Sequence, residues 1–379
     1  MPKDIKKPKW TNLPEFASDK VGGKIIFCTD EFFAAAERMI KFNEPESKKH
    51  ILTKSGVWMD GWESRRKRIE GHDWCILKLP VSCNVKGLVI DTCHFLGNFT
   101  PSVSIQAAEN PDLLKMPKYK SKMGNFSSKE EIEQVDKLCS KWKTIVSDTK
   151  LGAGNEATRF TYVSLNEKNN WTHLRINMLP DGGIARIRVH GIPKIPKLQK
   201  NKLVNLSSMF NGARVIYFND SFFSHANNLL VPGKSKNMHD GWETARKLNR
   251  PKTLKVNKNN LLVPYGKDWC VIMLAAPAVI EQVEVDTTHF KGNPPESFTL
   301  EGCFDKNYET NRAKDKYLYT NKECNKLGEW KKIKSQTKVK ANSNNVFKID
   351  NKNKFTHVRL SIIPDGGVSR LRIKGKIVN

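Results

Sequence analysis

The feature that most constrains the fold of this chain is an internal sequence repeat. Asp60-Gly61-Trp62-Glu63 returns as Asp240-Gly241-Trp242-Glu243, and the chain keeps the same order in four other blocks. These are GGKIIFCTDEFF with GARVIYFNDSFF, HDWCILKL with KDWCVIML, VIDTCHFLGN with EVDTTHFKGN, and THLRINMLPDGGIARIRVHG with THVRLSIIPDGGVSRLRIKG. Five blocks in one shared order indicate a tandem duplication of about 180 residues per copy.

The boundary between the copies follows from a Pro- and Lys-rich stretch, GIPKIPKLQKNK, at 191–202. Such a composition is typical of a linker and disfavours a helix or strand. We therefore predict a first domain at 1–192, a linker at 193–202 and a second domain at 203–379. Each copy is long enough to bury a core of its own.

The hydrophobic pattern within a copy has a period of two, which predicts strands. Apolar and polar residues alternate in THLRINM and again in IARIRVH, with the turn PDGG at 180–183 between them, so we expect a β-hairpin there. The segments VKGLVIDTCHF and SVSIQA also predict strands, and TDEFFAAAERMI at 29–40 predicts a helix with an N-cap at its start. The fold class is thus all-β: two tandem β-sandwich modules, each with a short helix.

Composition excludes several classes of protein. The net charge is +26, but 50 Lys are scattered through Asn-rich stretches, which favours a solvated basic surface over nucleic-acid binding. The sequence contains no run of about 18 apolar residues, so we predict no membrane span. The start MPKDIKKPKW lacks a secretory signal. Eight cysteines without a CxxC pair predict buried, reduced thiols. We expect a soluble cytoplasmic protein.

The motif DGWESRRKR is the first candidate site. Arg65 and Arg66 could hold a carboxylate through paired hydrogen bonds, and Trp62 between Asp60 and Glu63 could line a pocket. The alternative is a packed Trp at a Gly turn with a solvated basic tail. The second copy has Ala and Leu in place of two of the arginines, so the copies need not be equally active.

Two further motifs place histidine beside aspartate. GHDW contains His72 and Asp73, and DTCHF contains Asp91 and His94. A histidine could transfer protons near neutral pH, and an aspartate three residues away could orient it. The alternatives are a surface histidine and a buried aspartate that accepts backbone hydrogen bonds. The second copy keeps His289 but has Lys in place of His72, and one His with one Asp per copy is too few to predict a metal site.

The PDGG turns lead into strands that begin with Arg186 and Arg370. Arg186 with Arg188, and Arg370 with Arg372, are pairs on one strand face, which either bind carboxylates of the protein or are available to bind an anion. No phosphate-binding loop, nucleophile elbow or zinc-protease motif is present in the sequence.

From about Asn12 to Gly375 the sequence resembles the allantoicase family. The resemblance rests on the motifs MDGWESRRKR, GHDW, DTCHFLGN and LPDGGIARIRVHG and on their second copies. The resemblance implies two jelly-roll modules similar to galactose-binding-like domains, a homo-oligomer, and hydrolysis of allantoate to ureidoglycolate and urea. Insertions at 118–143, 247–260 and 306–342 depart from it and are expected to be surface loops.

That reaction needs a cation for the substrate carboxylate, a general acid and a general base. The candidate catalytic residues are His72, His94, Asp73, Asp91 and Glu63. The candidate substrate-binding residues are Asp60, Trp62, Arg65, Arg66, Arg186, His289 and Arg370. We expect no cofactor, although a divalent metal is not excluded. The alternatives are a non-catalytic pair of sandwiches that binds a glycan or another small anion, and a nucleic-acid binder.

Overall fold

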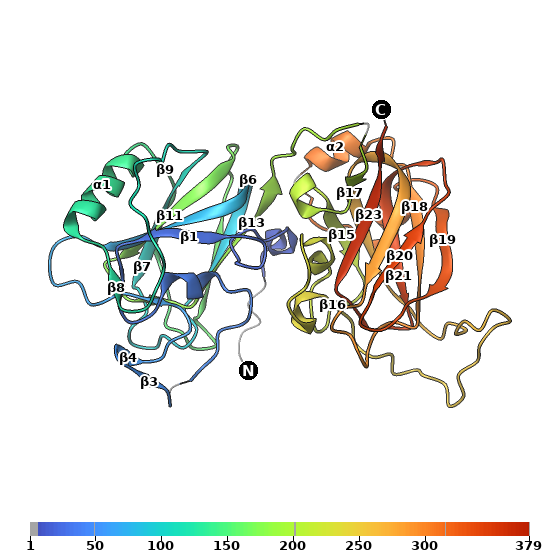
Figure 1. Cartoon of the computed structure of the whole chain (residues 1–379), viewed down its shortest axis with the longest axis horizontal. Coiled ribbons are helices and arrows are strands. Elements are labelled where there is room, and N and C mark those ends of the chain that lie inside the picture. Colours follow the sequence, from blue (N-terminus) through green and yellow to red (C-terminus); the bar gives the residue numbers. More distant parts are fainter. Residues whose placement is uncertain (1–6, 49, 201, 315, 379) are drawn as a thin grey trace. The chain divides into compact units, whose positions relative to one another are not determined.

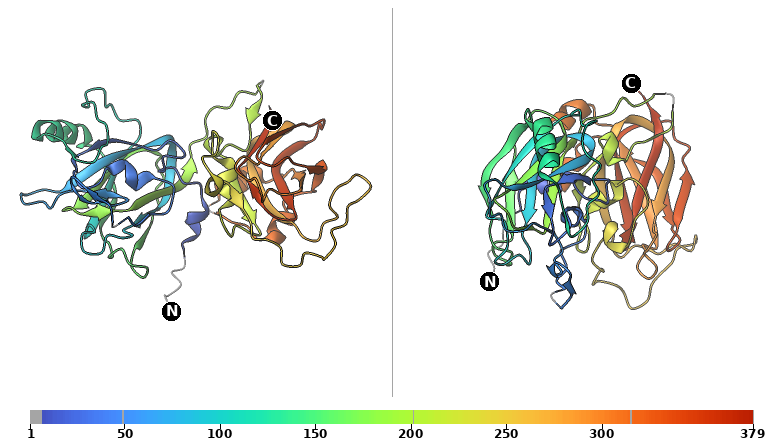
Figure 2. Two further views of the ribbon diagram at one scale, coloured as in Figure 1. Left: turned by 60° about the horizontal axis from the view of Figure 1, so that its bottom comes forward. Right: turned by 60° about the vertical axis from the view of Figure 1, so that its left-hand side comes forward.

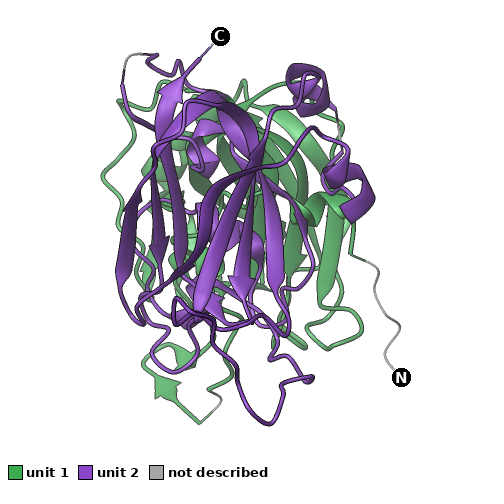
Figure 3. Cartoon of the chain, turned by 90° about the vertical axis from the view of Figure 1, so that its right-hand side faces the viewer, with its two compact units in different colours: residues 1–194 green, residues 195–379 purple. Residues whose placement is uncertain are grey.

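The computed structural model describes residues 7–378, except residues 49, 201 and 315. The chain divides into two compact units, Met1–Lys194 and Ile195–Asn379 (Figure 3). Each unit is built mainly of antiparallel strands, so the prediction of two tandem all-β modules is confirmed.

The first unit is organised around one long strand, β6 (Asp73–Asp91). Its first half pairs with β1 (Lys24–Cys28) and β11 (Trp171–Leu179), and its second half pairs with β10 (Phe160–Ser164) and β13 (Arg186–Pro193). Strands β7 (Ser102–Ala108) and β9 (Lys143–Lys150) extend the sheet beyond β11. Because β6 takes part in both sets of pairings, it joins the layers of the sandwich (Figures 1 and 2).

The second unit repeats this plan around β17 (Asp268–Asp286). Strands β15 (Arg214–Phe218) and β21 (Lys354–Ile363) pair with its first half, and β20 (Asn344–Lys348) and β23 (Arg370–Ile377) pair with its second half. Strands β18 (Ser297–Cys303), β19 (Lys331–Lys338) and β14 (Val204–Asn205) complete the sheet.

The predicted hairpin around PDGG is wrong, although its strands exist. Strands β11 and β13 both pair with β6, but with different halves of it, so the turn carries the chain from one layer to the other. The residues after the turn form a short strand, β12 (Gly183–Ile184), which pairs with β5 (Trp62–Glu63). The second unit has the same arrangement in β16 (Trp242–Glu243) and β22 (Gly367–Val368).

The predicted helix at 29–40 is confirmed only for its last five residues, which form a 3₁₀ helix and not an α-helix. This segment forms β2 (Asp30–Glu31) and a 3₁₀ turn, η2 (Ala36–Ile40), while Ala34 between them bridges Glu63 in extended conformation. The buried Glu31 carboxylate accepts the N–H of Ala36, so a side chain replaces the helical backbone partner.

The true helices lie in two insertions that were expected to be loops. Helix α1 (Lys129–Cys139) packs Val135 and Cys139 against Trp74 and Ile76 of β6. Helices α2 (Tyr308–Ala313) and α3 (Asn321–Asn325) contribute Tyr308 and Cys324 to a core cluster of the second unit. These insertions are therefore parts of the core and not only of the surface.

The remaining short elements are 3₁₀ turns and two-residue strands. They are η1 (Lys9–Asn12), β3 (Leu52–Thr53), β4 (Gly56–Val57), β8 (Asn125–Phe126), η3 (Met209–Asn211), η4 (Ala226–Leu230) and η5 (Met238–Asp240). All eight cysteines are buried and free. None of the helices in the described part of the chain combines the length and the apolar character that crossing a bilayer requires.

Candidate functional site

Three repeated motifs meet at one end of the first sandwich. Pairing of β5 with β12 sets Glu63 opposite Gly183, and Phe99 forms a bridge to Gly183 on its other side. This brings DGWE, LGN and PDGG side by side, although more than 80 residues separate the last two in sequence. Loops at the end of a sandwich are common locations for binding sites.

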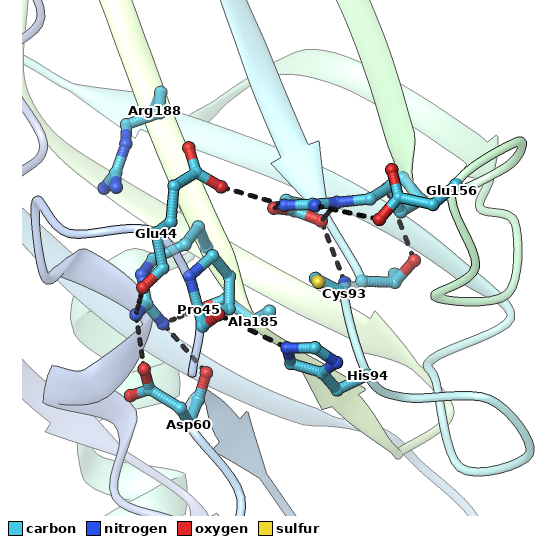
Figure 4. A network of polar contacts seen from close by, with 12 residues as sticks. Glu44, Pro45, Asp60, Cys93, His94, Glu156, Ala185 and Arg188 are labelled. Atoms are coloured by element: carbon cyan, nitrogen blue, oxygen red, sulfur yellow. Dashed lines mark hydrogen bonds and ion pairs between the residues drawn. The ribbon is translucent and has the colours of Figure 1, made fainter. Parts of the chain in front are cut away.

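Arg186 and Asp60 form a buried ion pair at this end, and Figure 4 labels Asp60. The Nη2 atom of Arg186 lies 2.6 Å from Asp60 Oδ2, and its other donors reach backbone carbonyls of Asp60, Ala185, Asn43 and Glu44. All five guanidinium hydrogens therefore have acceptors within the protein. Arg186 is only 2% exposed, so it has no free donor for a substrate.

The second repeat contains the same pair. Arg370 donates from Nη2 to Asp240 Oδ2 at 2.8 Å and is likewise 2% exposed. Trp62 and Trp242 are completely buried and donate their indole N–H to the carbonyls of Asp30 and Asp220. These residues hold the loops in place rather than line a cavity.

Asp91 and His94 do not form the expected orienting pair. The Asp91 carboxylate accepts two hydrogen bonds from Arg159, which also binds Glu44, and one from the N–H of Cys93. His94 has a left-handed backbone, with φ of 69°, and its Nε2 lies 3.2 Å from the carbonyl oxygen of Pro45 (Figure 4). His289 repeats this geometry, with φ of 74° and Nε2 2.9 Å from Ser235 O.

His72 and Asp73 point in different directions, as neighbours on a strand do. Asp73 is buried and accepts hydrogen bonds from Thr29 and Lys67. His72 lies in a shallow hollow of about 390 Å³ on the sheet face, where its Nε2 is 3.2 Å from Asn177 Oδ1. Burial lowers the pKa of His72, although the contact with Asn177 opposes this effect, so the ring is mostly neutral at pH 7.

The arginines of DGWESRRKR separate into bound and unbound groups. Arg65 donates to Asp30 at 2.7 Å and lies over the ring of Phe126 at 4.3 Å. Arg66 and Arg68 are exposed, and neither forms a hydrogen bond or ion pair with the rest of the described chain. Their guanidinium groups are therefore available to bind an anion from solvent.

Glu63 is a buried carboxyl group at the same end of the sandwich. It is 9% exposed and accepts a hydrogen bond of 2.6 Å from the amide of Asn98. Burial raises the pKa of Glu63, and the hydrogen bond from Asn98, which lowers it, offsets this only in part. The second repeat has the same contact between Glu243 and Asn293, and there too burial raises the pKa of the glutamate.

A pocket of about 980 Å³ opens beside this contact in the second repeat. Its lining includes Glu243, Asn293, Arg246 and Asp365. Arg246, which corresponds to Arg66, is exposed and unpaired within the described chain. Asp365, of the PDGG turn, accepts the N–H of Lys247 at 2.8 Å through one carboxylate oxygen. With Glu296, Arg250, Lys291 and Lys338, which also line it, the pocket combines four cations, one amide and three carboxyl groups.

Candidate metal ligands are not grouped in the described part of either repeat. Among residues 7–378, apart from the three undescribed positions, no cluster of three or more His, Cys, Asp or Glu could hold a metal ion. The second repeat brings Glu243, Asn293 and Arg246 to one pocket, and the first repeat has Glu63, Asn98 and Arg66 at the corresponding positions; we call each set a Glu–Asn–Arg group. Such a group can donate a proton, bind an amide and bind a carboxylate.

Comparison with known proteins decides the family. The family model described as the allantoicase repeat matches residues 14–194 and again 204–378. The chain is 37% identical to "Probable allantoicase 1" of Burkholderia mallei, over 97% of both chains, and 34% identical to "Probable allantoicase" of Photobacterium profundum, over 99% of both. The chain belongs to the allantoicase family. The allantoicase crystal structure from Saccharomyces cerevisiae is similar, with a TM-score of 0.70 and 31% identity over 98% of this chain and 94% of that one.

The allantoicase repeat explains why corresponding residues recur with corresponding contacts in both units. Sequence reasoning identified Glu63 and Arg66 but missed Asn98, Asn293 and Arg159. The signal for the two asparagines was present, because LGN and KGN follow DTCHF and DTTHF at the same spacing. Arg159 has no counterpart within the repeated blocks, so only its contact with Asp91 reveals it.

Proposed function

We propose that this chain is an allantoicase, which hydrolyses allantoate to ureidoglycolate and urea in the degradation of allantoin, a purine product. Membership of the allantoicase family over both repeats supports this function and does not favour a non-catalytic glycan binder. The protein is then a hydrolase that cleaves a C–N bond of a linear amidine.

The substrate defines what the site must supply. Allantoate carries one carboxylate and two ureido groups on its central carbon. The bond from that carbon to one ureido nitrogen breaks, the oxygen of water joins the carbon, and the leaving nitrogen takes a proton to become urea. The enzyme therefore needs a cation, a general acid and a general base around one carbon atom.

The Glu–Asn–Arg group fits these needs, and its recurrence in both repeats is the observation that carries the proposal. Arg66 or Arg246 binds the carboxylate as an exposed guanidinium. Glu63 or Glu243, whose pKa burial raises, keeps a proton more readily than an exposed carboxyl and gives it to the leaving nitrogen. Asn98 or Asn293 positions that carboxyl group.

The general base comes from the turn motif. Asp365 lines the same pocket as Glu243, and one of its oxygens is engaged by the N–H of Lys247. Its other oxygen can accept a proton from the attacking water. Other residues of the same motifs then position the loops that carry these groups. They are the Asp60–Arg186 and Asp240–Arg370 pairs, Asp91 with Arg159, and the two histidines with left-handed backbones.

The test is release of urea from allantoate by the purified protein, with and without a chelator. We expect release in both conditions, and a loss of at least ~10²-fold when Glu63→Gln and Glu243→Gln are combined, as removal of a general acid typically causes. Circular dichroism checks that the double variant remains folded. A folded wild-type protein that releases no urea, or a double variant of full activity, would contradict the proposal.

Two expectations on assembly and location belong to the same proposal. We infer that the enzyme works as a homo-oligomer, as the family resemblance implies, and in the cytoplasm. Eight buried, unpaired thiols support a reducing compartment. Sedimentation of the purified protein and fractionation of its host test these two points.

A further inference from the structure

The two Glu–Asn–Arg groups lie in different surroundings because of one insertion. Lys67 with Asp73 and Lys247 with Asp268 are corresponding ion pairs. In the first repeat only residues 68–72 separate the two partners, whereas in the second repeat the separating segment runs from 248 to 267. The long segment, which we call the insertion loop, appears in ochre as an extended loop of the second unit (Figures 1 and 2).

The insertion loop is fixed to the sandwich at defined points. The N–H of Leu262 donates to Glu296 Oε1 at 3.3 Å, and the carbonyl of Leu262 accepts from Gln336 at 2.8 Å. Asn249 donates to the carbonyl of Tyr265 at 2.9 Å and so closes the base of the loop. Val256 and Leu262 form a bridge within it. These contacts make the loop a defined wall.

This wall adds both apolar and cationic groups to the pocket of the second repeat. Its lining members are Arg250, Leu254, Val256, Leu262 and Tyr265. Arg250 is exposed and, like Arg246, has no hydrogen bond or ion pair to another residue that the structure describes. The first repeat has no residues that correspond to this wall, because its segment is too short.

We propose that hydrolysis takes place in the second repeat and that Arg250 of the insertion loop is a further substrate-binding residue. This inference rests on the proposed function. Two unpaired guanidiniums in one pocket suit a small diureido acid, because one can bind its carboxylate and the other a ureido carbonyl oxygen. Leu254, Val256 and Leu262 of the same wall give a bound substrate an apolar surface beside these charges.

A matched pair of glutamate variants tests the location of the reaction. Glu243→Gln and Glu63→Gln remove corresponding carboxyl groups with little change of volume. We expect Glu243→Gln to lower kcat at least ten times more than Glu63→Gln does, since a general acid typically contributes ~10²-fold or more. Equal losses, or a larger loss in Glu63→Gln, would overturn the inference. Urea release by the wild-type protein would leave the proposed function standing in that case, and its absence would contradict the proposed function itself.

Variants of the insertion loop test Arg250 without disturbing the core. Arg250→Ala should raise KM for allantoate at least tenfold with a smaller effect on kcat, and Arg250→Lys should restore part of the loss. Lys252→Ala is the control, because Lys252 is an exposed cation of the same loop that does not line the pocket, and it should leave KM unchanged. An unchanged KM in Arg250→Ala, or an equal rise in Lys252→Ala, would overturn the role of Arg250.

Discussion

At the scale of single residues, burial distinguishes the charged groups that are available to a ligand from those that stabilise the fold. Asp60 and Arg186 are 6% and 2% exposed, and each is the other's main partner. Removing one member of a buried ion pair leaves the other charged and unpaired, which costs about 3–5 kcal/mol. We therefore expect Asp60→Asn to lower the stability of the first repeat at pH 7 by about 3 kcal/mol, measured by thermal unfolding.

The pH dependence of that effect has a definite sign. Burial alone would raise the pKa of Asp60, but hydrogen bonds from Arg186 and from the N–H of Glu46 outweigh it, so the pKa lies below its ordinary value. The contribution of the carboxylate is thus complete above the unfolded-state pKa of about 3.9 and is lost as the pH falls through the lower folded-state pKa. The difference between wild type and Asp60→Asn should shrink in that acid range. Asp148→Asn, at an exposed position, should stay within about 0.5 kcal/mol of wild type throughout.

The sequence predicted the residues of the candidate site better than their roles. Asp60, Glu63, Arg66 and Arg186 all lie at one end of the sandwich, as their repetition in both copies suggested. A linear pattern does not reveal that five acceptors surround Arg186 while Arg66 has none among the described residues. Four of those five acceptors come from segments more than 120 residues away in sequence, and the fifth is the carbonyl of Ala185, so only tertiary packing distinguishes the two arginines.

At the scale of secondary-structure elements, local patterns predicted the long strands and failed where the chain changes layers. Strands β6, β7, β11 and β13 follow from alternation of apolar and polar residues. The turn signal at PDGG predicted a hairpin, yet β11 and β13 pair with opposite halves of β6. The segment at 29–40 has helical composition, but the contacts of Ala34 and Glu31 hold its first part extended, and only Ala36–Ile40 forms a 3₁₀ helix. In both cases tertiary pairing overrides local propensity.

The short β5–β12 pair depends on a glycine that packs directly on an aromatic ring. A Cβ atom at Gly183 would lie 2.1 Å from Cδ1 of Phe95, which is fully buried. Gly183→Ala must displace either the ring or β12, and such overpacking costs about 1–3 kcal/mol. We expect its melting temperature to fall accordingly. Gly97→Ala is the matched control in the adjacent loop, because a Cβ there meets nothing within 4 Å. Equal melting temperatures for the two variants would show that β12 tolerates the methyl group.

At the scale of the whole molecule, the duplication is the property that the sequence revealed most completely. Repeated blocks predicted two sandwiches, and each unit has its own long central strand, its own Asp–Arg pair and its own Glu–Asn contact. The repeat pattern could not predict the structure of the insertions, because their sequences do not recur in the other copy. Helix α1 packs on its sheet through apolar residues hidden in a Lys-rich stretch, and the insertion loop forms the wall of a pocket.

Because each repeat has its own core, we predict that a substitution in the core of one repeat destabilises that repeat alone. Asp60→Asn removes a partner buried inside the first unit, and Asp240→Asn removes the corresponding partner inside the second. Because each carboxylate is paired within its own unit, their effects should be independent. Hydrogen exchange measured by mass spectrometry should therefore show faster exchange in β6, β11 and β13 for Asp60→Asn, with β17, β21 and β23 unchanged, and the reverse for Asp240→Asn. Faster exchange in both sets of strands in either variant would mean that the two repeats unfold as one cooperative unit, and the stability of each site would then depend on residues of the other repeat.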